Sequence, residues 1–423
     1  MQAFNALPRV NIDDISRFQP SSIDQHILDQ TRGIITQVKE RGDSALYEYI
    51  RTFEKRDPQK VVVSKDELEK SYLKLPHHVQ SVLQRTALRI QTFAEAQLNC
   101  IRTMEIPIEG GVAGHDIAAI ERVACYAPGG HFPLPSTILM TAVTAKVAGV
   151  TDITIVTPSN DDLMLGAAYI AGADSLIHAG GAQAIAAVTY GTESVDPVDM
   201  IVGPGNRWVT AAKSIVHGIV GIDMLAGPSE LLVVADETAC SKTIAADLLA
   251  QAEHDPCACP ILVTQSERLV ESVNCNIISQ LKVLPTKKIA QQALLKGMAI
   301  ICSSDEEIIE AVNRLAPEHL ELIGKNAEKL SARIKHYGGL FIGHYSAEVF
   351  GDYGAGPNHT LPTGGTARFT GGLSVFNFLR IRTWMRINQP EQAQELMNDA
   401  HELAQLEGLM GHAHSAHIRQ SCF

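Results

Sequence analysis

Short β-branched runs alternate with helix-like segments through most of the chain, and this alternation constrains the fold more than any other feature. Four runs lie between residues 122 and 218, in "RVACYAPGG", "TDITIVTP", "DSLIHAGGAQ" and "DMIVGPGN". A second series begins at "ELLVVAD" and continues through "ILVTQ", "AIIC", "HLELIG" and "GLFIG". Such alternation is typical of parallel strands joined by crossover helices. The sequence therefore predicts an α/β protein with two similar halves.

Helical patterns flank these two halves. Residues 21–100 carry apolar side chains at helical spacing, which indicates a helical lead-in. After Phe376 the strand signals stop, and a helix is expected between Pro390 and Gly408. Its apolar face would consist of Leu396, Met397, Ala400, Leu403 and Ala404. We therefore expect two Rossmann-like parallel-sheet domains with α-helical N-terminal and C-terminal extensions.

Charge and composition exclude several classes of protein. Acidic residues outnumber basic ones by 47 to 35, the formal net charge is -12, and the sequence has no Lys/Arg cluster. This argues against nucleic acid and anionic membranes as partners. The N-terminus has no basic start followed by an apolar run, and no later segment stays apolar long enough to span a bilayer. The 8 scattered cysteines do not suggest a disulfide framework. We expect a soluble cytoplasmic protein.

Three turns between expected strands and helices are rich in glycine: "APGGHFP", "AGGAQA" and "VGPGNRW". Glycine lets backbone N–H groups at a helix start approach a phosphate. None of the turns has the G-x-G-x-x-G spacing, and any one of them alone fits an ordinary connection. Together they favour a phosphate-bearing ligand.

The stretch "QAEHDPCACP" ends a predicted helix of residues 243–254, which Pro256 closes. Asp247, Gln251 and His254 are spaced by four and three residues, so their side chains would share one face. Cys257 and Cys259 have a single residue between them, tighter than common zinc knuckles, which argues against a thiolate site. A lone histidine is more often structural, so this stretch alone leaves metal binding open.

Three further segments carry groups that bind metals or move protons. The loop "EVFGDYGAGPNHTLPTGG" contains Asp352 and His359, and "LAPEHLEL" places Glu318 beside His319 where a strand starts. The run "GHAHSAHIR" offers three histidines at positions 412, 414 and 417. Long glycine-rich loops such as the first commonly carry function. The other two segments also have an ordinary interpretation, as a solvated strand end and an accidental surface feature.

Taken together, the motifs resemble those of the histidinol dehydrogenase family, over nearly the whole chain. The most specific are "GGAQAIAAVTYGT", "DMIVGPGNRWVTAAK", "GIDMLAGPSE", "DLLAQAEHDP", "LAPEHLEL", "GDYGAGPNHTLPTGG" and "EGLMGHAHSAHIR". The resemblance implies a zinc- and NAD-dependent enzyme of the last steps of histidine synthesis. It also implies a homodimer that exchanges its C-terminal segments.

The resemblance assigns residues to each ligand. The zinc ligands would be Gln251, His254, Asp352 and His412. Substrate contacts would come from Ser229, Glu407 and His319 together with those metal ligands. The NAD contacts would be Tyr126, Gln183 and Asn206. Cys257 and Cys259 depart from the family pattern and would not be ligands.

The same resemblance implies a four-electron oxidation of L-histidinol to L-histidine through the aldehyde. His319 would accept the hydroxyl proton, and Glu318 would activate water against the aldehyde. Adjacent residues on a regular strand point to opposite faces, so we expect an irregular backbone at this pair.

The expected segments follow from these assignments. They are an N-terminal extension (1–20), the first part of the catalytic and zinc domain (21–121), the NAD-binding domain (122–229), the second part of the catalytic domain (230–375) and a tail exchanged between subunits (376–423).

Three alternatives remain at this point. A paralogue of the same fold would oxidise another small alcohol, such as a hydroxyalkyl sulfonate. A zinc hydrolase would leave the glycine-rich turns without a role. A catalytically silent scaffold would not need competent residues at every position that the chemistry requires.

Overall fold

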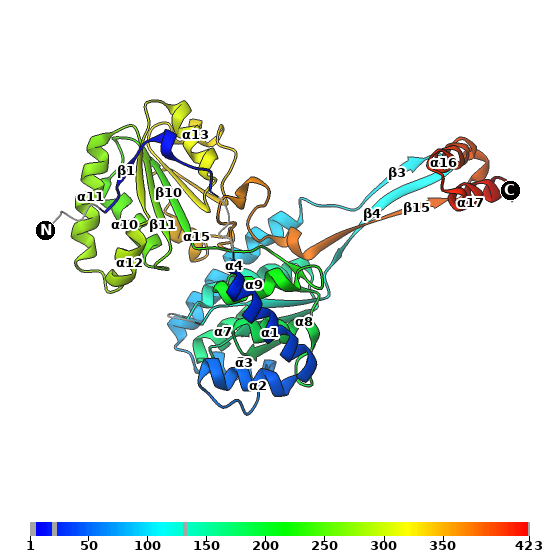
Figure 1. The fold of residues 1–423 in the computed structure, drawn as a ribbon, viewed down its shortest axis with the longest axis horizontal. Helices are drawn as coiled ribbons and strands as arrows, with labels where there is room; N and C mark the ends of the chain where they lie inside the picture. Colours follow the sequence, from blue (N-terminus) through cyan, green and yellow to red (C-terminus); the bar gives the residue numbers. More distant parts are fainter. Residues whose placement is uncertain (1–5, 19–22, 130–132, 422–423) are drawn as a thin grey trace.

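The computed structural model describes residues 6–18, 23–129 and 133–421 of the chain. Two α/β domains lie next to each other, and a narrow arm that ends in the C-terminal helices extends away from both (Figure 1). Residues 130–132 of the first glycine-rich turn and the first residues of the expected N-terminal extension lie outside the described parts.

The first domain is built on sheet A, whose strand order is β1-β12-β11-β10-β13-β14. In that order the strands span Arg9–Val10, Met298–Ile301, Cys259–Thr264, Glu230–Ala235, His319–Ile323 and Gly339–Ile342. All neighbouring strands are parallel. The second series of predicted strands is therefore confirmed, and part of the N-terminal extension joins this sheet as its edge strand.

The second domain is built on sheet B, whose strand order is β2-β7-β6-β5-β8-β9. The strands span Val62–Ser64, Ser175–His178, Asp152–Thr157, Arg122–Tyr126, Met200–Val202 and Gly221–Ile222. Strand β2 is antiparallel to β7, and the other pairs are parallel. The first predicted series is thus confirmed as well, with an antiparallel strand added at one edge.

Helices cover both faces of sheet A because its buried strands are apolar on both sides. Leu231 and Val233 pack with α10, α11 and α12, whereas Leu232 and Val234 face α13 and α14. These helices span Ser241–Ala252, Glu267–Leu281, Lys287–Leu294, Asp305–Leu315 and Ala327–Ser331. A further short helix, α15 (Glu348–Asp352), follows β14 and packs near α10 and β13.

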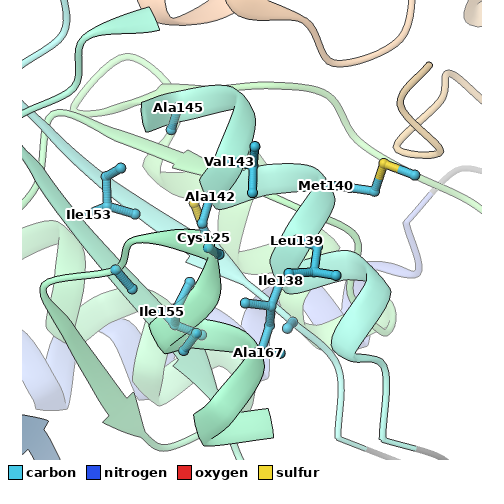
Figure 2. Close-up of a cluster of buried hydrophobic side chains, with 14 of the residues drawn as sticks. Cys125, Ile138, Leu139, Met140, Ala142, Val143, Ala145, Ile153, Ile155 and Ala167 are labelled. Carbon is cyan, nitrogen blue, oxygen red and sulfur yellow. The ribbon is translucent and has the colours of Figure 1, made fainter. Parts of the chain in front are cut away.

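Sheet B is covered in the same way. One face packs with α1, α2, α8 and α9, which span Gln25–Arg41, Asp43–Tyr49, Gly181–Tyr190 and Arg207–Val216. The other packs with α3, α4, α5, η3, α6 and α7, which span Lys65–Lys74, His77–Leu98, Pro135–Ile138, Leu139–Val143, Thr144–Ala148 and Asp162–Ala171. Figure 2 shows the centre of this second core, where Cys125, Ile153 and Ile155 of the strands meet Leu139 and Ala167 of the helices.

The helical lead-in packs on a different sheet from the one that we expected. We had grouped residues 21–121 with residues 230–375, but α1 packs against α8 and α9, and α3 packs against α7. Strand β2 of the same region belongs to sheet B. The amphipathic pattern shows that one face of each helix is buried, but it does not show against which of two similar sheets.

The arm is a three-stranded antiparallel sheet in the order β15-β4-β3. Its strands span Leu379–Ile387, Gly111–Ala119 and Met104–Ile108. Two helices, α16 (Gln394–Leu406) and α17 (Met410–Ser421), lie at its far end (Figure 1). The predicted tail helix is confirmed as α16, but the prediction that strands stop after Phe376 is wrong. Polar and apolar residues mix in "LRIRTWMRI" because both faces of this narrow sheet are largely solvated.

No helix in the described residues is long and apolar enough to cross a membrane.

Candidate active site

The predicted catalytic pair, Glu318 and His319, lies at the amino edge of sheet A. Strand β13 begins at His319, and Glu318 lies just before it, after Ala316 in a left-handed conformation with φ 50°. The backbone also bends at Glu318 itself and becomes a regular strand only from His319, so the irregularity that we expected is present at the first residue of the pair. His319 Nδ1 lies 3.1 Å from the carbonyl oxygen of Glu230 and 3.6 Å from Glu318 Oε2. Both side chains thus reach the same buried space.

Short helix α15 brings two carboxylates to this space. Glu348 Oε1 and Asp352 Oδ1 each lie 3.8 Å from His319 Nε2. Ligand atoms of these three residues lie within 4.8 Å of one another, a spacing that suits a metal ion. His254 Nε2 lies 3.9 Å from Asp352 Oδ2, and His359 Nδ1 lies 3.0 Å from the Asp352 carbonyl oxygen.

Helix α10 contributes Gln251, which is fully buried. Within the described chain, neither Nε2 nor Oε1 of Gln251 has a hydrogen-bond partner, and the same holds for His319 Nε2 and Glu348 Oε1. Buried polar atoms without partners are costly unless a ligand satisfies them. The helix ends at Ala252, so His254 lies in the turn after it rather than on the helix as we expected. The turn still directs its imidazole to Asp352.

Burial shifts the pKa values of four groups in the cluster. Burial raises the pKa of Glu230 to about 7 and raises the pKa of Glu318 well above its ordinary value. Burial also raises the pKa of Glu348, and the nearby charge of Asp352 adds to this effect. The pKa of His319 falls to about 4, mainly through burial. So many buried carboxyl groups around neutral imidazoles favour a bound cation.

The three predicted coenzyme residues meet at the carboxyl edge of sheet B. Tyr126 ends β5, and its hydroxyl accepts the Gly181 N–H at 3.1 Å. Gln183 is buried in the first turn of α8, and Asn206 caps α9 by accepting the N–H groups of Trp208 and Val209.

A buried ion pair supports the turn that leads to Asn206. Lys213 and Asp223 pair with side chains that are 3% and 0% exposed. Lys213 Nζ donates to the carbonyl oxygen of Gly203 at 3.0 Å, and Asp223 Oδ2 accepts the Gly203 N–H at 2.7 Å. Gly203 has a φ of 106°, and an added Cβ would lie 2.1 Å from the Tyr126 carbonyl oxygen. Only glycine therefore fits at this position beside Tyr126.

Glu407 and His412 lie elsewhere in the single chain. Both are exposed, Glu407 at the end of α16 and His412 in α17, at the tip of the arm and away from β13 and α15 (Figure 1). Ser229 lies directly before β10, and its side chain is near enough to Glu318 to oppose part of the burial-driven rise in the Glu318 pKa. One chain therefore brings His254 close to Asp352, with Gln251 buried three residues before His254, but it does not bring His412 to them.

A family model described as histidinol dehydrogenase matches residues 18–420. The chain belongs to the histidinol dehydrogenase family. It is 42% identical to histidinol dehydrogenase from Thermus thermophilus over 402 residues, covering 94% of this chain and 96% of that relative. It is 40% identical to the protein of the same name from Methanocaldococcus jannaschii, covering 93% of each.

A solved structure agrees with this assignment. The crystal structure of histidinol dehydrogenase from Elizabethkingia anophelis superposes with a TM-score of 0.92 at 34% identity, covering 99% of each chain. The chain is therefore an oxidoreductase of this family, and the resemblance seen in the sequence is confirmed.

Sequence reasoning missed several carboxyl groups of the cluster. Glu348, Glu230 and Glu321 are 2%, 7% and 0% exposed, yet none was singled out. Glu321 Oε1 accepts the Glu348 N–H at 2.7 Å and so anchors the start of α15. A signal was present, because a glutamate inside the apolar strand "HLELI" points into the core.

Proposed function

We propose that this member of the histidinol dehydrogenase family oxidises L-histidinol through L-histidinal to L-histidine, with one zinc ion per subunit and two NAD. The observation that carries the proposal is the buried cluster around His319, where imidazoles, carboxyl groups and an unpartnered amide converge at the amino edge of sheet A. A simple scaffold would have no reason to keep so many polar atoms buried and unpartnered.

Gln251, His254, Asp352 and His412 would hold the zinc ion. The donor set is made of nitrogen and oxygen atoms, which suits zinc, and both unpartnered atoms of Gln251 support a missing ligand there. When bound, zinc would position the amino alcohol and draw electron density from it. Cys257 is exposed and Cys259 faces the Lys296 carbonyl oxygen at 3.4 Å, so neither is needed in the set.

His319 is suited to accept the hydroxyl proton. Its Nδ1 lies 3.1 Å from a carbonyl oxygen, which only accepts hydrogen bonds, so Nδ1 carries the proton. The lone pair of Nε2 then points into the cluster. Because burial lowers the His319 pKa to about 4, the ring is neutral near pH 7 and ready to act as a base.

Glu318 is suited to the second step. Its carboxyl group accepts the Glu230 N–H at 2.9 Å, which fixes the direction of the side chain. Burial raises its pKa and makes the carboxylate a stronger base than it would be in water. It would take a proton from the water that adds to the aldehyde, before hydride leaves for the second NAD.

The first test is direct. Zinc-loaded protein mixed with L-histidinol and NAD should form NADH, measured by its absorbance. A protein that reduces NAD only with another alcohol, such as a hydroxyalkyl sulfonate, would belong to a paralogous branch and would contradict the proposal.

Zinc content tests the ligand set. His254→Asn should lower the bound zinc several-fold, because it removes a nitrogen donor beside Asp352. The matched control replaces Cys257 and Cys259 with serine, which should leave zinc content unchanged. Equal zinc losses in both proteins would restore a thiolate site.

We also propose that the arm of a second subunit completes each site. In the single chain, Leu396, Leu403 and Met410 remain 39%, 58% and 60% exposed at the tip of the arm. Burying each large apolar side chain is worth roughly 1.5–3 kcal/mol, so this tip favours docking on a partner. A partner arm would bring Glu407 and His412 to the cluster.

Complementation tests the exchange. A subunit with His319→Asn is combined with one carrying His412→Asn, each nearly inactive as its own homodimer. In a mixed dimer one site collects both changes and the other neither, so activity should rise toward half of wild type. Mixed dimers without recovery would show that the arm serves its own chain.

A further inference from the structure

Glu54 occupies an unusual place at the coenzyme edge of sheet B. It ends the turn η2 (Ile50–Glu54), and its side chain is 12% exposed. Glu54 Oε1 accepts the Gly180 N–H at 3.0 Å and the side-chain amide of Gln183 at 3.3 Å. Gly180 caps the N-terminus of α8. A carboxylate of the protein itself therefore lies where a helix N-terminus would bind an anion.

A second N–H group at this helix start, that of Gly181, is also occupied. Tyr126 Oη accepts the Gly181 N–H at 3.1 Å, and the charge of Glu54 acts on this phenol. In dinucleotide-binding folds the coenzyme phosphates use such N–H groups. Here Glu54 and Tyr126 offer oxygen atoms in their place, so the α8 start repels phosphate and suits hydroxyl groups.

Arg56 lies on the far side of the carboxylate. Its Nε and Nη2 lie 3.0 and 2.9 Å from Glu54 Oε2, and Nη2 also donates to the carbonyl oxygen of His178. The guanidinium charge is thus used within the protein. As long as Glu54 is ionised, the positive charge of Arg56 is compensated within the protein and does not attract an anionic ligand.

The pair of Glu54 and Arg56 lies on the side of sheet B where the adenosine half of the coenzyme would bind. Strand β7 and helix α8 lie on the β5–β6–β7 side of sheet B, and in doubly wound sheets the first strands hold the adenosine half of the coenzyme. An acidic residue there distinguishes a ribose 2′-hydroxyl from a 2′-phosphate by charge.

We propose that Glu54 makes the enzyme select NAD over NADP, by accepting a ribose hydroxyl of the coenzyme and repelling a 2′-phosphate. This inference rests on the proposed NAD-dependent oxidation. It adds a specificity residue beside Tyr126, Gln183 and Asn206. The reaction itself is unchanged, because either coenzyme would take up the same hydride.

The test compares kcat/KM for NADP and NAD with L-histidinol as substrate. Glu54→Gln keeps the size and an acceptor for Gly180 but removes the charge and releases Arg56. The ratio of NADP to NAD efficiency should rise roughly tenfold. The matched control is Glu193→Gln, because Glu193 Oε2 also accepts a backbone N–H at a helix start, that of Asp43 at 2.7 Å. Glu193 lies in the α8–β8 connection, at the other edge of sheet B, and its variant should leave the ratio unchanged.

A folded Glu54→Gln protein that loses efficiency equally with both coenzymes would overturn the inference, since a merely structural role lowers both in parallel. A measurement on the wild type does not depend on the variant. AMP should compete with NAD more strongly than adenosine 2′,5′-bisphosphate, and the reverse order would also overturn the inference. A wild type without NAD reduction would instead contradict the proposed function.

Discussion

The two sheets of this chain have the same strand order, yet they present their polar groups at opposite edges. In each, the first strand of the series is central, the next two lie on one side and the last two on the other. In sheet B the predicted coenzyme residues follow the carboxyl ends of the strands. In sheet A the buried titratable groups Glu230, Glu318 and His319 lie at the amino ends.

Strand order alone therefore does not determine which edge of a sheet carries the polar groups of a candidate site. Ligands in doubly wound sheets commonly bind outside the carboxyl ends, where the strand order reverses. At that edge of sheet A, Asp236 accepts the N–H groups of Thr238 and Lys325 and so ties the loops after β10 and β13 to each other. Buried groups without partners lie at the other edge. Unsatisfied polar atoms therefore indicate a candidate site at an edge of the sheet that its strand order alone would not select.

The largest effect is expected in kcat, and it should distinguish a change at the amino edge of sheet A from a change at the carboxyl edge of sheet B. His319→Asn should lower kcat by about 10³- to 10⁴-fold, because the base for the hydroxyl proton is lost, while the KM for NAD stays close to wild type. Asn206→Ala at the sheet B edge should instead raise the KM for NAD several-fold, with a smaller change in kcat. Steady-state kinetics in both substrates measures this. A His319 variant whose only defect is weaker NAD binding would contradict the separation.

The next effect concerns the support of the sheet B edge. Lys213→Met leaves Asp223 buried without its partner and should lower the free energy of unfolding by about 3 kcal/mol. The KM for NAD should rise as well, because the Gly203 turn loses its anchor. Denaturant unfolding provides the measurement, and Lys146→Met, at an exposed lysine of the same domain, is the control. Equal stability of the two variants would show that the buried pair is dispensable.

The smallest effect lies away from both edges, at the capping box of α3. Glu67 accepts hydrogen bonds from Ser64 and pairs with Lys60, which lowers the Glu67 pKa from 4.5 to about 2. The unfolded chain binds more protons in this range, so the stabilisation is complete above pH 4.5 and is lost as the pH falls toward 2. Glu67→Gln should cost about 0.5 kcal/mol at pH 7. The difference in melting temperature between Glu67→Gln and wild type should therefore become smaller at low pH. A difference that becomes larger at low pH would contradict this explanation.

Much of the fold could be predicted from the sequence, because strands buried on both faces give continuous apolar runs such as "ELLVVA". Strand β15 was missed because both faces of the arm are solvated, which removes the apolar pattern. The partner of the helical lead-in was missed because a buried helix face does not identify the sheet that it covers.

The candidate site was predictable only in part. Among the motif residues, His254 and His319 lie close to Asp352, and Glu318 lies beside His319. Gln251 is buried three residues before His254. The tertiary fold is needed to see that Glu348 joins this cluster. Glu407 and His412 lie at the end of α16 and in α17, and no spacing in the sequence tells where these helices dock.

The central claim is that two bases at the amino edge of sheet A support two successive oxidations. The most direct measurement is the number of NADH formed per L-histidinol consumed, with the product identified at the same time. The wild type should give two NADH and L-histidine, whereas Glu318→Gln should retain more of the alcohol step than of the aldehyde step. One NADH per histidinol in the wild type, with aldehyde released as the product, would contradict the account.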